Sequence, residues 1–194
     1  IVETAFVTTL AMAVFAVLFG TRHIDATEHQ DGLMVAIAAE SLIKLIAFLS
    51  VGIFVVFYAF GDMVTFMATV SLNDEIVARF GTIDQTSTWL VVTLLSAICI
   101  IVLPRQFHVT VVENRSENEI RRARWLLPLY LALINLFVVP IAAAGLILIP
   151  PALAQPDVFV LAIPMQLDAG LITVLAYIGG LSAATAMIVV ESIA

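Results

Sequence analysis

The stretch LMVAIAAESLIKLIAFLSVGIFVVFYAF, residues 33–60, decides the fold. It is almost entirely apolar, and it is longer than the about 20 residues that a helix needs to cross a bilayer. In the whole chain, 62% of the residues are hydrophobic and 12% are charged, whereas a soluble domain is usually about one quarter charged. The sequence therefore predicts an all-α membrane protein.

Similar apolar stretches recur along the chain and predict about five transmembrane helices in a single domain, residues 1–194. Pro128 and Pro140 fall in the fourth of these spans, and each lacks a backbone N–H, so we expect that helix to bend. The chain ends at Ala194 inside an apolar helical pattern, and we expect it to be a fragment of a longer protein. The predicted spans cover about 4–20, 32–60, 87–104, 125–149 and 166–194.

The distribution of arginine predicts the orientation of the spans. The loop 105–124 holds five of the eight basic residues, which places it on the cytoplasmic side by the positive-inside rule. Alternation then places the loops 61–86 and 150–165 outside, and both carry more acidic than basic residues. Apolar residues recur at helical spacing within 61–86, which predicts one or two short amphipathic helices over the outer mouth.

Two ionisable residues lie one helical turn apart inside the second span. Lys44 falls close to the middle of the bilayer, where an isolated charge costs several kcal/mol, and Glu40 precedes it by four positions on the same helix face. One interpretation is that the two side chains neutralise each other and help the helix to pack. The other is that Lys44 exchanges a proton or occupies an ion position in a solute pathway.

Other candidates for the solute or ion pathway are Ser41, next to Glu40, and Asn135 in the fourth span, whose more usual role would be a packing hydrogen bond. His23, His29 and His108 lie in predicted cytoplasmic loops with a spacing unlike that of a metal site. Cys99 is the single cysteine, which excludes a disulfide within the chain. We expect no metal site, no cofactor and no nucleic-acid partner from these patterns.

Three stretches resemble a known family: FGTRHIDATEHQDGLMVAIAAESLIKL (19–45), LPRQFHVTVVEN (103–114) and RRARWLLPLYLALINLFVVPIA (121–142). They are similar to the sodium/solute symporter family, and most similar to the symporter-like N-terminal membrane domain of some bacterial sensor histidine kinases. The resemblance covers essentially the whole chain. It implies the LeuT-type inverted-repeat transporter fold, of which these spans would be core helices four to eight.

The resemblance also implies candidate residues for a cytoplasmic gate. Thr27 and Glu28 resemble a Thr-Asp pair at the start of core helix five, with Glu in place of Asp. Leu103 and Pro104 resemble the start of an LPH motif that closes core helix six, but Arg105 replaces its histidine. We therefore expect Thr27, Glu28 and Arg105 at the gate.

A departure from the family pattern concerns the second sodium site. The Ser-Thr pair that the family carries on core helix eight falls here on Met187 and Ile188, which have no hydroxyl, so this site is expected to be lost. In sodium-independent relatives of the fold, a lysine on core helix five can stand in place of the sodium, and Lys44 is the lysine expected there. A register shifted by one turn would instead bring Ser182 or Thr185 into place.

Three functions remain open at this stage. The resemblance implies a membrane domain of the bacterial inner membrane that binds and transports a small, amino acid-like solute, with Na⁺ or H⁺ as coupling ion, and that is coupled to signalling by a sensor histidine kinase. Alternatives are a plain sodium/solute symporter, or a transport-inactive receptor coupled to a kinase domain in the same chain and to a response regulator. A membrane anchor fits less well, because mid-membrane Glu40 and Lys44 would then be costly without benefit. No enzymatic motif occurs in these residues, so a kinase would lie beyond Ala194.

Overall fold

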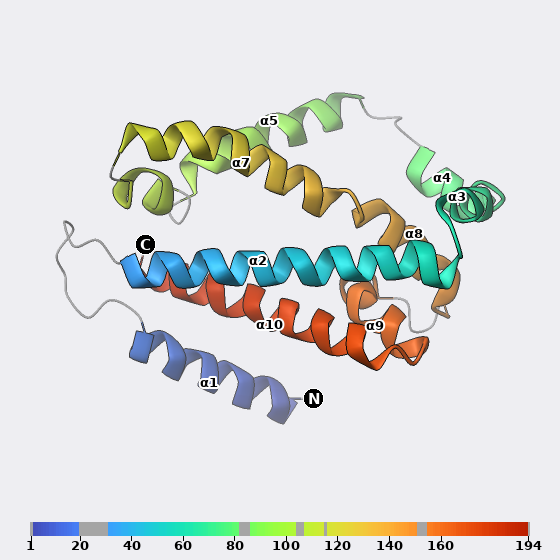
Figure 1. The fold of residues 1–194 in the computed structure, drawn as a ribbon, viewed down its shortest axis with the longest axis horizontal. Coiled ribbons are helices and arrows are strands. Elements are labelled where there is room, and N and C mark those ends of the chain that lie inside the picture. The colour runs from blue at the N-terminus through green and yellow to red at the C-terminus, as the bar shows by residue number, and fades with distance from the viewer. Residues whose placement is uncertain are drawn as a thin grey trace.

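The computed structural model describes residues 2–19, 31–81, 86–103, 107–114, 116–150 and 155–193. These residues form helices and the turns between them, and no strand occurs among them (Figure 1). The fold class predicted from the sequence is therefore confirmed at the level of an all-helical chain.

Three helical segments of the described residues are long and apolar enough to cross a membrane. This supports the prediction of a membrane protein. The first comprises α2, Asp31–Ile53, and the π-helical continuation η1, Phe54–Ala59. The others are α7, Glu117–Asn135, with α8, Val138–Leu148, and α10, Gly170–Ile193.

The other two predicted spans are also helical. They correspond to α1, Val2–Phe19, and α5, Thr86–Val102. Within α5 the apolar segment Thr88–Cys99 is shorter than the three segments that could cross a membrane. Most residues of this stretch are exposed, and Cys99 is a free thiol on its surface.

The described helices differ in extent from several predicted segments. Residues 117–124, assigned to the cytoplasmic loop, are the first two turns of α7. Residues 159–166, assigned mainly to an outer loop, form the helix α9, Phe159–Gln166, preceded by the 3-10 turn η3, Pro156–Val158. The last span therefore begins at Gly170 and not at 166, after a turn in which Asp168 adopts a φ of 52°.

The fourth span is interrupted at one proline and not at the other. Helix α7 continues through Pro128, whereas Leu136 and Phe137 form a turn between α7 and α8. Pro140 lies in the first turn of α8 and has no N–H to donate to the carbonyl of Leu136, four residues earlier. The helix resumes when Ile141 N donates to Phe137 O at 2.9 Å.

Helices α2 and α10 pack side by side in opposite directions, so that the end of α10 lies beside the start of α2 (Figure 1). Gly179 makes this close approach possible: a methyl group on it would lie 2.5 Å from the Cβ of Ala47. Small residues at such contacts let two backbones approach closely, which is the usual basis of helix association in membranes.

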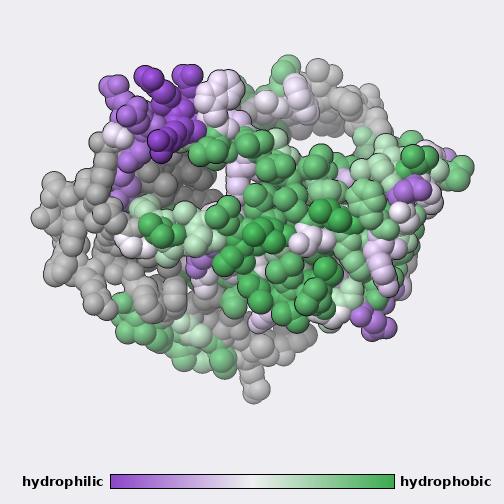
Figure 2. Space-filling view, viewed as in Figure 1, coloured by the Kyte–Doolittle hydropathy of each residue, from purple (hydrophilic) through white to green (hydrophobic). Residues whose placement is uncertain are grey.

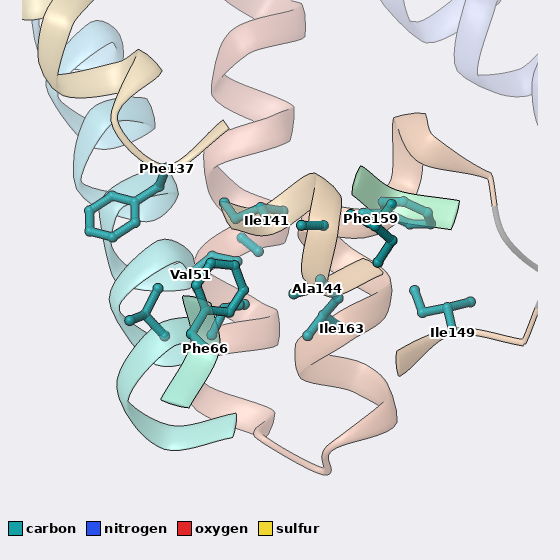
Figure 3. Packing of buried hydrophobic residues seen from close by; sticks show 13 residues of the cluster. Val51, Phe66, Phe137, Ile141, Ala144, Ile149, Phe159 and Ile163 are labelled. Atoms are coloured by element: carbon teal, nitrogen blue, oxygen red, sulfur yellow. The ribbon is translucent and has the colours of Figure 1, made fainter. Parts of the chain in front are cut away.

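The best-packed part of the molecule lies at the end where α2 passes into η1. Buried residues from α2, α8 and α9 meet there with the ring of Phe137 from the α7–α8 turn (Figure 3). Gly52 and Gly145 leave room for the rings of Phe137 and Phe159, which a methyl group on either glycine would overlap. The labelled residues of this cluster are Val51, Phe66, Phe137, Ile141, Ala144, Ile149, Phe159 and Ile163.

Two short helices cover this end of the bundle, α3, Met63–Ser71, and α4, Asp74–Gly81. The prediction of one or two helices within 61–86 is confirmed. Each helix buries one side chain in the core, Phe66 from α3 and Ile76 from α4. Figure 1 places this pair at one end of the bundle and the start of α7 at the opposite end.

Asp62 caps the first turn of α3. Its Oδ1 accepts a hydrogen bond from the backbone N–H of Thr65 at 2.6 Å. This backbone hydrogen bond, together with a bond from the Thr65 side chain, holds the pKa of Asp62 below its usual value, because both bonds favour the carboxylate. The cap fixes where the chain turns after η1.

Candidate functional site

A cavity of about 610 Å³ lies between α2, the α7–α8 turn, η3 with α9, and α10. Its walls are mainly aliphatic and aromatic. Lys44, Asp157 and Tyr177 are the polar side chains among its lining residues. The remaining lining residues are Ala47, Phe48, Ile134, Val138, Val158, Val160, Leu161, Ala176, Gly179, Gly180, Leu181 and Ala183.

Lys44 supplies the positive charge of this cavity. It lies about ten residues after Met34, where the first membrane-spanning segment starts, so it is about 15 Å along the helix axis and close to the middle of the hydrocarbon core. The side chain is half-buried. Within the described part of the chain, no hydrogen bond or ion pair holds its ammonium group.

Glu40 does not form an ion pair with Lys44, although both side chains belong to α2 and are described. It contacts α10 instead. Thr185 Oγ1 lies 3.1 Å from Glu40 Oε1, and Ser182 Oγ donates to the backbone carbonyl of Glu40 at 3.0 Å. The acid therefore helps to hold α2 and α10 together, one turn from the cavity.

The hydroxyl of Thr185 has more acceptors within reach than it has protons. Besides Glu40 Oε1, the carbonyl oxygens of Leu181 and Ser182 lie 3.1 Å from Thr185 Oγ1. A hydroxyl donates one hydrogen at a time. The bond to Glu40 can therefore be exchanged for a bond within α10 without leaving the hydroxyl unsatisfied.

Asp157 supplies the negative charge of the cavity. It lies in η3, the 3-10 turn that leads into α9, and its side chain is exposed while still lining the cavity. Helix α9 is fixed at this position because Phe159 and Ile163 are buried and Gln166 Nε2 donates to the carbonyl of Leu148 at 3.1 Å. No ion pair joins the described side chains of Asp157 and Lys44.

Asp157 was not among the residues predicted for the site. It was expected only as one of the acidic residues of an outer loop. A usable signal was present, because an acid at the start of the apolar run VFVLAIPM follows the pattern of a helix first turn. The position of that helix beside Lys44 is a tertiary feature that the local pattern does not contain.

Two other predicted pathway residues bond to their own helices. Ser41 Oγ donates to Ile37 O at 2.9 Å, and Asn135 Nδ2 donates to Leu131 O at 2.7 Å, at the end of α7. Neither residue lines the cavity. The observed contact of Asn135 is a hydrogen bond within α7, which agrees with the alternative interpretation of this residue as a packing residue.

The remaining predicted residues fall in two groups. Thr27, Glu28 and Arg105, the expected gate residues, lie outside the described residues. Met187 is exposed and Ile188 is half-buried. The hydroxyl groups that α10 turns toward α2 belong instead to Ser182 and Thr185.

No metal-binding group of three or more His, Cys, Asp or Glu side chains occurs among the described residues. Any cation at the α2–α10 contact would have to be bound by the oxygens of Glu40, Thr185 and neighbouring carbonyls.

The geometry can be compared with known proteins. No family model, no curated protein and no solved structure matches this chain.

Proposed function

We propose that this chain is a solute-binding membrane domain that takes an amino acid-like solute into the cavity between α2, α7–α8, α9 and α10. The observation that carries the proposal is the placement of one amine, Lys44, and one carboxylate, Asp157, on otherwise apolar walls. A zwitterion with an apolar side chain matches this arrangement. Its carboxylate would bind Lys44 and its ammonium group would bind Asp157.

The size of the cavity favours a small solute. Pockets for small organic molecules usually measure roughly 300–1,000 Å³, with apolar walls and a few polar groups that fix the orientation. The cavity, at about 610 Å³, falls within this range. It also lies between helices near the middle of the spans, where transporters commonly place their binding sites.

The cost of placing the charge of Lys44 near the bilayer centre favours the binding of an anion beside it. A charge near the bilayer centre costs several kcal/mol unless it has a partner. Glu40, the nearest acid in the sequence, bonds to Thr185 and forms no ion pair with this lysine. A solute carboxylate would therefore supply the partner that the described part of the chain does not.

The interrupted helix α7–α8 favours transport over binding alone. The turn at Leu136 and Phe137 lies between Ile134 and Val138, both of which line the cavity. Broken helices at a binding site are typical of transporters that work by alternating access. We propose that α8 changes its angle to α7 as the cavity opens and closes.

The coupling ion is proposed to be a proton exchanged at Lys44, in the place that sodium has in the symporter family. The oxygens around Thr185 and Glu40 favour a second possibility, coupling to Na⁺, because hydroxyl, carbonyl and carboxylate oxygens are the ligands of hard cations. The Arg-rich segment 105–124 would lie on the cytoplasmic side of a bacterial inner membrane.

Uptake by the intact protein in sealed proteoliposomes tests this proposal. Labelled apolar amino acids are added with a proton gradient or a sodium gradient imposed separately. Proton-driven uptake supports transport with Lys44 as the coupling group, and sodium-driven uptake supports the second possibility, coupling to Na⁺. Binding without uptake under either gradient would contradict transport and point to a receptor that signals through a kinase domain in the same chain.

A further inference from the structure

A second charged feature lies at the opposite end of the molecule from α3 and α4. The first turns of α7 carry Arg121, Arg122 and Arg124, followed directly by Trp125. All four side chains are exposed. Figure 2 shows the hydrophilic side chains of this view gathered most densely over the start of α7, whereas hydrophobic side chains cover most of the described surface in the middle.

The three guanidinium groups have no hydrogen bond or ion pair within the described part of the chain. The single interaction found for them is that of Arg124, whose Cζ lies 5.6 Å from the centroid of the Trp125 ring. Arg121 and Arg122 precede Trp125 by four and three positions. Helix geometry therefore places both of them on the same side of α7 as the indole.

The acidic residues near this cluster do not neutralise it. Glu117 lies four positions before Arg121, yet no ion pair joins these two described side chains. Glu113 and Glu119 are the other acids nearby, and each has an interaction of its own. The segment Glu117–Trp125 contains three arginines and two glutamates, so its net charge is positive.

The position of the cluster relative to the membrane follows from the chain itself. Trp125 is followed at once by the exposed apolar residues Leu126 and Leu127, within the segment Glu117–Leu148 that is long and apolar enough to span a membrane. The arginines therefore lie where this segment leaves the hydrocarbon. Tryptophan rings are enriched at the depth of the lipid headgroups.

We propose that Arg121, Arg122, Arg124 and Trp125 form a binding site for the headgroup of an anionic phospholipid. The planar guanidinium group donates paired hydrogen bonds that match the oxygens of a phosphate. The indole ring anchors the helix at the same depth and holds Arg124 beside it. Basic residues next to a membrane surface attract anionic lipids in this manner. This site is separate from the solute cavity.

Tryptophan quenching tests the proposal, because the chain has two tryptophans. The variant Trp89→Phe leaves Trp125 as the single probe. The intact protein is reconstituted in phosphatidylcholine vesicles that contain brominated phosphatidylglycerol or, at the same mole fraction, brominated phosphatidylcholine. We expect stronger quenching by phosphatidylglycerol, and a relative binding constant that falls about fivefold or more when Arg121, Arg122 and Arg124 are all replaced by Gln.

Two controls separate a specific site from a general attraction. In Trp125→Phe the single probe is Trp89 near the start of α5, outside the arginine cluster, and the two brominated lipids should quench it equally. Arg79→Gln, in the Trp89→Phe background, removes a guanidinium that is already paired with Glu75 at 2.8 Å on α4 and should leave the lipid preference unchanged. Equal quenching of Trp125 by both lipids, or a preference that survives the triple substitution, would overturn the proposal.

Discussion

Lys44 on α2 and Asp157 on η3 line one cavity and do not pair with each other. This relationship leaves one positive and one negative side chain at the wall of an apolar site without pairing to each other. If they were paired, each would neutralise the other and the cavity would offer a solute little beyond apolar walls. Because they remain apart, both are available to a molecule that carries a carboxylate and an ammonium group.

The contact between Thr185 and Glu40 should contribute measurably to the association of α2 and α10. Thr185→Val keeps the shape of the side chain and removes the hydroxyl that lies 3.1 Å from Glu40 Oε1. We expect the free energy of unfolding in mixed micelles, followed by circular dichroism, to fall by about 0.5–1.5 kcal/mol. A double-mutant cycle with Glu40→Leu should show a coupling of similar size.

Thr173→Val provides the matched control for this cycle. The hydroxyl of Thr173 is on the same helix, but it donates to Ala169 O at 3.0 Å, in the turn that precedes α10, and not to α2. It should show no coupling to Glu40. Strictly additive effects of Thr185→Val and Glu40→Leu would mean that the contact contributes nothing to helix association.

The close approach of α2 and α10 can be tested at two adjacent glycines. Gly179→Ala would place a methyl group 2.5 Å from the Cβ of Ala47, so one helix must move away. The expected cost is about 1–3 kcal/mol of unfolding free energy. Gly180→Ala meets nothing within 4 Å, and it should be neutral or stabilise α10 by up to about 1 kcal/mol. Equal destabilisation by both variants would contradict the packing described here.

The cap of α3 should depend on pH in a defined direction. Hydrogen bonds from Thr65 lower the pKa of Asp62 from its usual value of 3.8. A group whose pKa is lower in the folded state stabilises that state above its unfolded pKa, and this contribution is lost as the pH falls through the folded-state pKa. The protection factor of the Thr65 amide, which is the hydrogen-exchange rate of an unprotected amide at the same pH divided by that of Thr65, should therefore stay constant near neutral pH and fall below pH 3.8.

Asp62→Asn gives the control for this titration. Asparagine also accepts a hydrogen bond at an N-cap but does not titrate. The protection factor of the Thr65 amide should then show no such fall in acid. If the wild type and Asp62→Asn have the same pH dependence, the carboxylate of Asp62 is not the cap.

Three of the five predicted spans coincide with helical segments long and apolar enough to cross a membrane, because the apolar signal is local in the sequence. Residues 32–60 were expected to form one span, and α2 with η1 occupies 31–59. The start of α7 was not predicted because the segment ENEIRRAR is strongly hydrophilic, and hydropathy alone assigns such a segment to a loop. Helix α9 was missed because the prolines at 150, 151 and 156 suggested a loop, and because its helicity depends on burial of Phe159 and Ile163.

Only one residue of the candidate site, Lys44, could be predicted from the sequence. A lysine is easily recognised within an apolar span, and Lys44 lines the cavity in the structure. The partner expected for it, Glu40, shares its helix but bonds across to Thr185, far away in the chain. Asp157 reaches the cavity through the fold of η3 and α9, and local spacing does not contain that information.

Equilibrium binding of labelled leucine to the intact protein in nanodiscs tests the central claim most directly. Isocaproate, which lacks the amine, and isoamylamine, which lacks the carboxylate, serve as competitors. We expect leucine to bind, and its Kd to rise about 30-fold or more in Lys44→Met and in Asp157→Asn, because each removes one charged partner, while Glu75→Gln on α4 changes nothing. Isoamylamine should compete equally well in the wild type and in Lys44→Met. If leucine and other apolar amino acids bind equally to the wild type and to Lys44→Met, or bind to neither, the cavity is not the solute site.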